Sequence, residues 1–421
     1  MEMAKMENNE IKNSKLIPRL RFPGFEGEWE EKKLGELADR INRRNRQLEV
    51  SRVLTNSATD GVVDQSDYFE RDIAVKGNTD NYHIVEIEDF VYNPRISSSA
   101  PVGPISVNKV GRGIMSPLYT IFRFHCGCTP FFEQYFRTNI WHPYLKSIAN
   151  FGARFDRMNI TTEGFFDMPL LIPTLPEQQK IASCLSELDN LIVAQNQKVD
   201  ALKEKKKGLM QQLFPQPGET TPRLRFPGFE GEWVEKKFKD FTFSSGQKNK
   251  QNLPYERYSI SNETGFCPQN DQFEGGGGYL KNIDCRMYII VSPKSFAYNP
   301  ARINVGSIGY QNLGKKVIVS SLYEVFQTTD ICDDTFLWHW FKSNVFRKMV
   351  VDVQEGGVRQ YFYYNKLQEC SIYLPTLSEQ QQIASCLSSL DDLIDAESAK
   401  VEALKDHKKG LMQQLFPQPT K

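Results

Sequence analysis

The sequence predicts an α+β fold, in which two similar mixed α/β domains are separated by two long antiparallel coiled-coil helices in a pseudo-twofold internal repeat. Residues 18–29 read PRLRFPGFEGEW and recur unchanged at 222–233. Residues 175–217 recur at 377–419 with 32 of 43 positions identical. The repeats divide the 421-residue chain into two halves, each long enough for one globular domain and one long helix.

The same repeats set the boundaries of five segments. Residues 1–17 form a polar N-terminal extension, 18–174 and 218–376 the two mixed domains, and 175–217 and 377–421 the two helical spacers. The order of these blocks is circular, because PRLRFPGF follows the LFPQP block in mid-chain and also stands near the start of the chain. We therefore expect the two chain ends to lie close together.

Both mixed domains are expected to share one arrangement of short strands and helices. FVYNPRI at 90–96 corresponds to FAYNPARI at 296–303, and GIMSPLYTIF at 113–122 corresponds to VIVSSLYEVF at 317–326. Runs of β-branched and aromatic residues, interrupted by Gly and Pro, predict strands at 119–124, 287–291, 316–319 and 322–326. Helix-like apolar spacing occurs at 131–146 and 334–350.

The two helical spacers carry the apolar seam of a coiled coil, with steps of four and three residues. The expected helix-pairing residues are Ile181, Leu185, Leu188, Ile192, Val199, Leu202, Leu209, Leu213, Ile383, Leu387, Leu390, Ile394, Val401, Leu404, Leu411 and Leu415. Polar residues fill the remaining seam positions, namely Gln195, Lys206, Glu397 and Lys408. Pro176 lies at a helix start, and Pro215 and Pro417 mark the stops, so each helix should extend roughly 57 Å. Antiparallel pairing would bury both seams and place the domains at opposite ends.

Composition excludes several classes of protein. The chain has 52 Lys plus Arg and 52 Asp plus Glu, so global charge gives no argument for nucleic-acid binding. No apolar run approaches the ~20 residues of a membrane span, and the polar start does not resemble a targeting peptide, so we expect a cytoplasmic protein. The eight cysteines show no C-x2-C spacing. Cys126 and Cys128, after His125, could ligate a metal, but reduced thiols are favoured and no metal is expected.

No constellation of catalytic residues is evident. Asn93-Pro94 and Asn299-Pro300 lack the following proline and aromatic ring of the amino-methyltransferase motif. The four glycines at 275–278 lack the lysine and hydroxyl residue of a phosphate-binding loop. The five histidines are scattered, with no nucleophile motif around them. The chain is therefore expected to be non-catalytic.

Local charge does favour an anionic partner. Residues 90–160 contain eight basic and two acidic residues. Two further basic clusters stand at comparable places near the start of each mixed domain: Arg40, Arg43, Arg44 and Arg46, and Lys236, Lys237, Lys239, Lys248 and Lys250. Charge clusters are common on solvated surfaces, but their repetition in both halves favours binding to phosphate.

The combination of these motifs closely resembles the specificity subunit of type I restriction-modification systems. The resemblance covers nearly the whole chain, from about Pro18 to Pro419. It rests on helices that begin LPEQQKIA or LSEQQQIA and end KKGLMQQLF, with YNPRI and SPLY inside the first domain. The second half inserts Ala301, which gives YNPAR instead of YNPR.

The resemblance implies a non-catalytic subunit with two target-recognition domains, each reading one half of a split, asymmetric target in double-stranded DNA. The helices would space these domains and dock two modification subunits that methylate adenine with S-adenosylmethionine. Restriction subunits would join to cleave unmethylated DNA with ATP and Mg²⁺. No cofactor is expected on the chain itself. A rod of two helices would also exceed the ~34 Å of one DNA turn.

The internal repeat sorts the candidate DNA-binding residues. Residues shared by both halves should be scaffold or phosphate contacts, because they cannot explain different target sequences: Tyr92, Asn93, Ser116, Tyr119, Tyr298, Asn299, Ser320 and Tyr323. Base-reading candidates in the divergent stretches are Arg43, Arg44, Arg46, Gln247, Lys248 and Lys250. The remaining candidates are basic residues at matching places, namely Arg95, Arg154, Arg157, Arg302 and Arg359.

Two rival functions remain open at this point. A coiled-coil protein scaffold without DNA binding would keep its partners but show no sequence-specific DNA affinity. A self-sufficient methyltransferase would bind S-adenosylmethionine as the purified chain.

Overall fold

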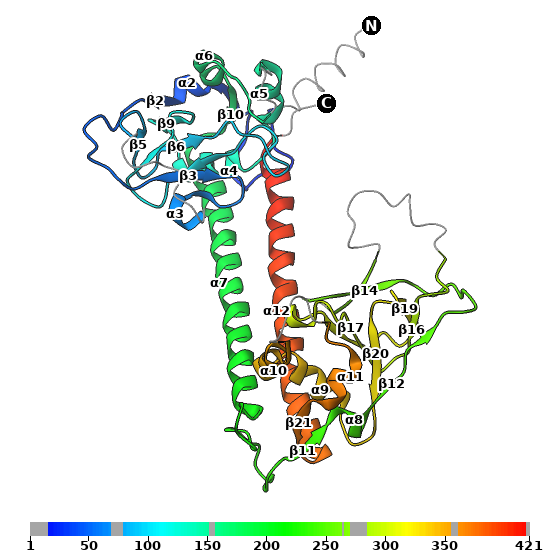
Figure 1. Ribbon diagram of the computed structural model, residues 1–421. Helices are drawn as coiled ribbons and strands as arrows, with labels where there is room; N and C mark the ends of the chain where they lie inside the picture. Colours follow the sequence, from blue (N-terminus) through cyan, green and yellow to red (C-terminus); the bar gives the residue numbers. More distant parts are fainter. Residues whose placement is uncertain are drawn as a thin grey trace. The chain divides into compact units, whose positions relative to one another are not determined.

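The computed structural model describes residues 16–68, 79–150, 156–262, 265–269, 284–354 and 361–417 (Figure 1). The chain divides into two compact units. Unit 1 comprises Met1–Gln195 and Lys400–Lys421, and unit 2 comprises Asn196–Ala399. Each unit therefore joins one mixed domain to the first half of the helix that follows it and to the second half of the other long helix.

The first mixed domain and its helix contain the following elements in chain order: β1 (Glu30–Lys33), α2 (Leu34–Leu37), β2 (Ala38–Ile41), β3 (Leu54–Ser57), β4 (Gly61–Asp64), α3 (Gln65–Tyr68), β5 (His83–Val85), β6 (Phe90–Tyr92), β7 (Ile105–Val107), β8 (Gly113–Met115), β9 (Thr120–Phe124), α4 (Thr129–Phe136), α5 (His142–Ile148), α6 (Thr162–Phe166), β10 (Pro169–Ile172) and α7 (Leu175–Leu213). A four-stranded antiparallel sheet has the order β2-β9-β6-β7. Three strand pairs, β1-β10, β3-β4 and β5-β8, complete the described strands.

The second mixed domain repeats this plan with β11 (Val234–Lys237), α8 (Phe238–Phe241), β12 (Thr242–Ser244), β13 (Gln247–Lys248), β14 (Tyr258–Ser261), β15 (Gly265–Pro268), β16 (Ile289–Val291), β17 (Ser295–Tyr298), η1 (Ile303–Val305), β18 (Ile308–Gln311), β19 (Val317–Val319), β20 (Glu324–Thr328), α9 (Asp334–Phe341), α10 (Asn344–Gln354), α11 (Tyr364–Glu369), β21 (Ser371–Leu374) and α12 (Leu377–Leu415). Its four-stranded sheet, β12-β20-β17-β18, matches that of unit 1. A three-stranded sheet, β13-β16-β19, extends the counterpart of the β5-β8 pair.

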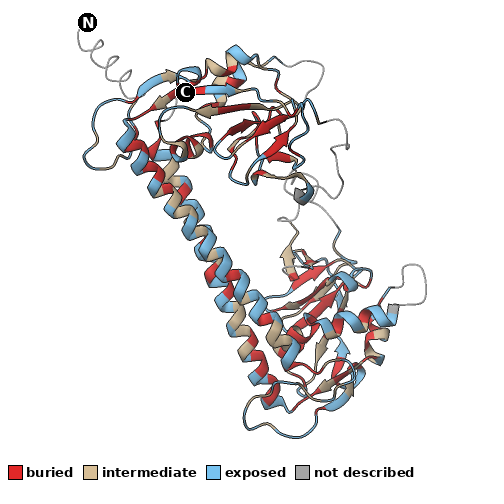
Figure 2. Cartoon of the chain, turned by 90° about the vertical axis from the view of Figure 1, so that its left-hand side faces the viewer, coloured by how far each residue is buried: buried red, intermediate tan, exposed pale blue. Residues whose placement is uncertain are grey.

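An aromatic core lies against one face of each four-stranded sheet. Phe90 on β6 and Phe122 on β9 are fully buried and stack with ring centroids 5.5 Å apart. Phe296 on β17 and Phe326 on β20 stack in the same way at 5.2 Å. Figure 2 shows buried residues concentrated inside each mixed domain. The predicted likeness of the two domains is therefore confirmed at the level of their cores.

Each stretch with helix-like spacing forms two helices instead of one. The first stretch is divided into α4 and α5, and the second into α9 and α10. The Thr138 hydroxyl donates a hydrogen bond to the Tyr135 carbonyl at 2.7 Å, and the Ser343 hydroxyl donates one to the Trp340 carbonyl at 2.6 Å. Hydroxyl side chains that bond to a carbonyl of the preceding turn compete with the backbone ladder, which accounts for the break at this repeat position.

The two predicted long helices are confirmed, and each contains 39 residues. They run antiparallel within each unit. In unit 1, Lys408 near the end of α12 pairs with Asp189 in the first half of α7 at 2.7 Å. In unit 2, Lys206 near the end of α7 pairs with Asp391 in the first half of α12 at 2.5 Å. The polar seam positions thus hold ion pairs across the helix interface.

All sixteen predicted helix-pairing residues are buried or half-buried. Those at the helix ends also enter the domain cores. The core of unit 1 includes Ile181 and Leu185 from the start of α7 and Leu415 from the end of α12. The core of unit 2 includes the equivalent residues Ile383, Leu387 and Leu213. Both long helices therefore contribute side chains to the core of each domain. The seam residues at the helix ends pack in the domain cores as well as between the helices.

The repeated twelve-residue block holds the helix ends together. The Arg21 guanidinium donates two hydrogen bonds to the buried Glu177 carboxylate at 2.8 and 2.7 Å. The backbone N–H of Leu20 donates to the carbonyl of Gln414 at 3.0 Å. Arg225, Glu379, Leu224 and Gln212 form the same contacts in unit 2. The described chain therefore begins beside the end of α12, as the circular order of the blocks predicts.

Two further features of the described ranges bear on function. No helix there is both long and apolar enough to cross a bilayer. No group of three or more His, Cys, Asp or Glu side chains in those ranges is arranged to hold a metal ion. Cys126 and Cys128 are free thiols.

Candidate nucleic-acid interface

A rigid basic loop follows β2 in unit 1 and is built around Asn45. The Asn45 side chain is fully buried and bonds both ways to the backbone of Val50, donating to its carbonyl at 2.8 Å and accepting from its N–H at 3.1 Å. The N–H of Leu48 donates to the carbonyl of Asn45 at 2.9 Å, and Leu48 has a φ of 51°. A leucine in this left-handed region is held there only where the surroundings fix it.

The same loop is built around Asn249 in unit 2. The Asn249 side chain is 1% exposed and bonds both ways to the backbone of Leu253, at 3.0 and 2.9 Å. The N–H of Asn252 donates to the carbonyl of Asn249 at 2.8 Å, and Asn252 has a φ of 50°. We call the two segments 43–50 and 247–253 the Asn loops. Both place a left-handed residue three positions after the buried asparagine, but the backbone partner of that asparagine follows it by five residues in unit 1 and by four in unit 2.

Both Asn loops carry basic side chains on either side of the buried asparagine. In unit 1 these are Arg44 and Arg46, and in unit 2 they are Lys248 and Lys250. The Arg44 guanidinium donates to the carbonyl of Asn81 at 2.9 Å. Arg46, Lys248 and Lys250 are exposed, and no ion pair joins them to another described residue. The predicted correspondence between the two basic clusters is therefore found at these positions.

The positive charge of the first Asn loop affects a buried histidine on the neighbouring strand β5. The backbone of Arg44 forms an isolated antiparallel β-bridge with that of His83 on β5, and the His83 side chain is buried. Burial, followed by the charges of Arg44 and Arg40, lowers the pKa of His83. His83 is therefore neutral at neutral pH, and the positive charge of this region comes from arginine.

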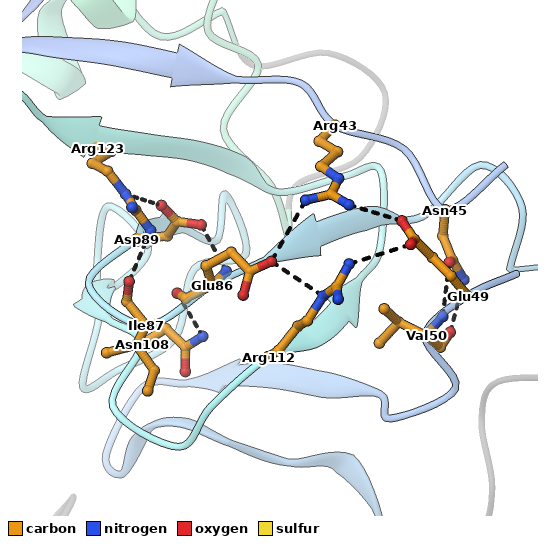
Figure 3. A network of polar contacts seen from close by, with 10 residues as sticks. All are labelled: Arg43, Asn45, Glu49, Val50, Glu86, Ile87, Asp89, Asn108, Arg112 and Arg123. Carbon is orange, nitrogen blue, oxygen red and sulfur yellow. Dashed lines mark hydrogen bonds and ion pairs between the residues drawn. The ribbon is translucent and has the colours of Figure 1, made fainter. Parts of the chain in front are cut away.

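Arg43 is the first residue of the first Asn loop and belongs to a network of four charged side chains (Figure 3). Its guanidinium nitrogens lie 3.0 Å from the Glu49 carboxylate and 3.7 Å from that of Glu86. Arg112 contacts the same two carboxylates at 3.4 and 3.1 Å. All four side chains are exposed, so the network contributes little stability but restricts the position of Arg43. At the equivalent position, unit 2 has the exposed Gln247 on β13.

Three of the eight shared residues are buried inside the domains, and the other five are half-buried. Tyr92 is buried, and its hydroxyl donates to the carbonyl of Val102 at 3.0 Å. Asn93 donates to the carbonyl of Asn56 at 3.0 Å and accepts from the N–H of Arg95 at 3.1 Å. In unit 2, Tyr298 is fully buried, and Asn299 accepts from the N–H of Ala301 at 3.0 Å. Of the two roles open to these residues, burial favours the scaffold for the tyrosines and Asn93.

The shared SPLY and SSLY motifs form matching turns. The Ser116 hydroxyl accepts from the N–H of Leu118 at 3.3 Å, and that of Ser320 accepts from the N–H of Leu322 at 3.4 Å. The Tyr119 hydroxyl lies 3.1 Å from that of Thr55, and the Tyr323 hydroxyl accepts from the N–H of Ile260. These contacts position the turns, and the serines remain half-buried.

The remaining candidates are arginines. Arg95 is exposed and bridges through its backbone to Arg157, which pairs with Asp156 at 3.6 Å. Arg302 is also exposed and precedes η1. Arg154 and Arg359 lie outside the described residues. The structure therefore brings Arg95 and Arg157 together.

The basic count over 90–160 overstates the free charge of that region. Arg123 pairs with the buried Asp89 at 2.7 Å, and Arg137 pairs with Asp189 at 2.8 Å, both acids lying outside the window. Lys237 and Lys239 of the second basic cluster likewise share the carboxylate of Glu369 at 2.9 and 3.0 Å. A window along the sequence misses such partners because folding brings them from distant segments.

The buried asparagines of the Asn loops were not recognised from the sequence. A signal for them was present, because Arg44-Asn45-Arg46-Gln47 and Lys248-Asn249-Lys250-Gln251 share the pattern basic–Asn–basic–Gln. The divergence of the flanking residues concealed this pattern.

Comparison with known proteins agrees with this architecture. The family model of the type I restriction modification DNA specificity domain matches the chain twice, over residues 26–204 and 231–406. The type I restriction enzyme MjaVIII specificity subunit of Methanocaldococcus jannaschii is 26% identical over 278 residues. This match covers 60% of the chain and 62% of that subunit, so the chain spans less than two thirds of its length.

Two solved structures share the fold. The S subunit of the type I restriction-modification system from M. genitalium aligns with a TM-score of 0.55 at 12% identity, over 96% of this chain and all of that one. A chain from a structure describing complex assembly and conformational transition of the type I R-M system also gives 0.55, at 13% identity, over 94% of this chain and 99% of that one.

The duplicated mixed domain with a long repeated helix defines a class of two-domain proteins with an internal pseudo-repeat. Because the family model covers most of both halves, the chain belongs to the type I restriction modification DNA specificity family.

Proposed function

We propose that the chain is the specificity subunit of a type I restriction-modification complex and that each mixed domain reads one half of a bipartite target in double-stranded DNA. One observation carries this proposal. A loop with basic residues on both sides of a buried asparagine, and with a left-handed residue three positions further on, is built once in each unit. A loop that is repeated while its side chains differ is suited to reading two different half-sites.

The Asn loops separate phosphate binding from base reading. Arg46 and Lys250 occupy equivalent positions, and the residue there is basic in both units. This position therefore suits phosphate contacts, which carry no sequence information. Position 43 differs from its equivalent, position 247. An arginine such as Arg43 matches the two acceptors of guanine, whereas a glutamine such as Gln247 matches the donor and acceptor of adenine. We assign these two residues as base readers.

Catalysis is assigned to partner subunits that act with the chain in the cytoplasm. Two modification subunits would carry S-adenosylmethionine and methylate adenine, and restriction subunits would use ATP and Mg²⁺. The repeated helices support two equivalent docking sites, because their sequences and their contacts with each domain recur in both units.

The modified DNA motif tests the assignment to DNA. Cells expressing the chain with its modification subunit should carry N6-methyladenine in a split motif, detected by single-molecule sequencing. Replacing residues 234–373 with the corresponding segment of another family member should change one half of that motif. A change in both halves would contradict independent reading. Full partner binding without sequence-specific DNA binding would instead identify a protein scaffold.

Substitution of the buried asparagines tests the loops themselves. Asn45→Ala removes two buried hydrogen bonds, so the first half-site should lose its specificity while the second is unchanged. Asn249→Ala should have the converse effect. Asn42→Ala, at an exposed position beside the first loop, is the matched control. If both variants keep the wild-type motif, the Asn loops do not read DNA.

A further inference from the structure

Each unit contains a pocket between the second half of one long helix and the corner between two short helices of its mixed domain. The pocket of unit 1, beside the α4–α5 corner, has a volume of about 840 Å³, and that of unit 2, beside the α9–α10 corner, about 380 Å³. Helix α12 lines the first with Lys405, Lys408, Lys409 and Met412. Helix α7 lines the second with Lys203, Lys206, Lys207 and Met210.

The two pockets are equivalent sites in the internal repeat. The four residues from α12 and the four from α7 occupy the same positions of the repeated 43-residue block. The opposite helix adds Asp189 to one pocket and Asp391 to the other, and these residues are also repeat-equivalent. The helical parts of the two sites therefore have a common design, whereas the pocket of unit 1 is also lined by the β3–β4 hairpin and by β7, which have no counterpart in the lining of the pocket of unit 2.

Both pockets carry excess positive charge. The lining of unit 2 contains five cationic side chains and one carboxylate, and that of unit 1 contains five and three. Asp391 binds Lys206 and Asp189 binds Lys408, so in each pocket the deepest lysine is paired with an acid. The outer lysines of both pockets are exposed: Lys203, Lys207, Lys405 and Lys409. Among the described residues, Lys207 pairs with Glu204 at 3.4 Å and Lys405 pairs with Glu402 at 2.7 Å, each an exposed acid of the same helix. These outer charges favour an anionic ligand.

Apolar side chains line the same pockets and restrict the kind of anion. Met412 and Trp141 contribute to the pocket of unit 1, and Met210 and Val345 to that of unit 2. A DNA backbone offers no apolar side chain to such a surface. A protein segment that combines acidic and apolar residues matches both features.

We propose that each pocket binds an acidic segment of the modification subunit, so that one copy docks on each unit. This inference rests on the proposed function and names the site and chemistry of docking. Equivalent pockets on one chain bind identical partners, which explains why the lysines of KKGLMQQLF recur in both helices although the recognition surfaces diverge.

The stoichiometry of the complex tests the proposal. The full chain is co-expressed with its modification subunit, and the number of bound copies is measured by native mass spectrometry. The double variant Lys203→Glu with Lys207→Glu should reduce the number of bound copies from two to one, because its new negative charges repel the acidic segment from the pocket of unit 2. Lys405→Glu with Lys409→Glu should do the same in unit 1, and all four together should leave no copy bound. Lys205→Glu, on the exposed face of α7 outside the pocket, should retain two copies.

These substitutions leave Lys206 and Lys408 in place, so the ion pairs between the helices are preserved. Should a charge-reversed variant fail to fold, as judged by its melting temperature, the neutral pair Lys203→Gln and Lys207→Gln replaces it. That pair should weaken one of the two binding steps about ten-fold.

Each other outcome overturns a specific statement. Two copies retained on every folded variant would refute docking in the pockets, while the proposed function stands. Two copies retained together with reduced DNA affinity would assign the pockets to DNA phosphates and refute the inference. A wild-type chain that binds no modification subunit would refute the proposed function itself.

Discussion

The two Asn loops carry different side chains around the same two features, a buried asparagine and a left-handed residue three positions later. In unit 1, Arg43 is held between Glu49 and Glu86, and Arg112 contacts the same carboxylates. In unit 2, Gln247 replaces Arg43, and no equivalent network surrounds it among the described residues. The buried asparagine and the left-handed residue are retained in both. The comparison shows that loop geometry and surface charge are separable, because buried hydrogen bonds fix the first and exposed side chains supply the second.

The largest expected effect tests whether the buried arginine–glutamate ion pair stabilises the two units to the same extent. Arg21→Leu leaves the Glu177 carboxylate buried without its partner, and Arg225→Leu does the same to Glu379. Each variant should lose about 3–5 kcal/mol of unfolding free energy in its own unit, measured by urea denaturation. Arg19→Leu, at an exposed position in the same block, should lose less than about 1 kcal/mol. Unequal losses of unfolding free energy would show that the two copies of the repeated block stabilise their units to different extents.

The next effect concerns the position at which the loops differ. Arg43→Gln should shift one base pair of the first half-site from guanine towards adenine, and Gln247→Arg should make the opposite shift in the second. Discrimination at that base pair should change by about 1–3 kcal/mol, measured by competition binding with single-base substitutions. An unchanged preference would limit the Asn loops to phosphate contacts.

An acid-sensitive group distinguishes unit 2 from unit 1 at another repeat position. His339 is 1% exposed, and burial, followed by the charge of Lys206, lowers its pKa to about 4. Unit 1 has Gln134 there, which donates to Asp189 at 3.0 Å. Between about pH 6.5 and 4 the unfolded chain binds a proton at this histidine that the folded chain does not, so stability present above pH 6.5 is lost as the pH falls.

His339→Gln should therefore remove about 2 kcal/mol of the loss in stability of unit 2 between pH 7 and pH 5. Thermal unfolding at the two pH values measures this difference. His407→Gln, at an exposed histidine on α12, should leave the acid sensitivity unchanged. Equal acid sensitivity in the wild type and in His339→Gln would show that protonation elsewhere governs unit 2.

The smallest effect tests the phosphate role of the shared basic residues. Arg46→Ala and Lys250→Ala should weaken binding to all DNA sequences alike. Each should reduce the slope of log K against log salt concentration by about 0.9, measured by titration between 50 and 200 mM salt. A loss confined to one base pair would make these residues base readers instead.

The candidate site could be predicted from the sequence only in part. The correspondence of Arg44 and Arg46 with Lys248 and Lys250 was visible, because these residues stand at the same distance from the repeated block. The frame of the loops was not, since the buried role of Asn45 depends on its hydrogen bonds to Val50. Arg123 and Arg137 counted as free charges because their partners, Asp89 and Asp189, lie outside the window that was counted.

The sequence by itself determined the duplication and the two long helices, because heptad spacing and repeat identity are local properties of the chain, and it predicted their antiparallel pairing. The tertiary structure alone decided that each unit takes half of each helix and that Arg21 reaches Glu177. It also decided which basic residues remain free. Such outcomes depend on contacts between residues 34 to 156 positions apart, whose partners are selected by packing and by the cost of burying an unpaired charge.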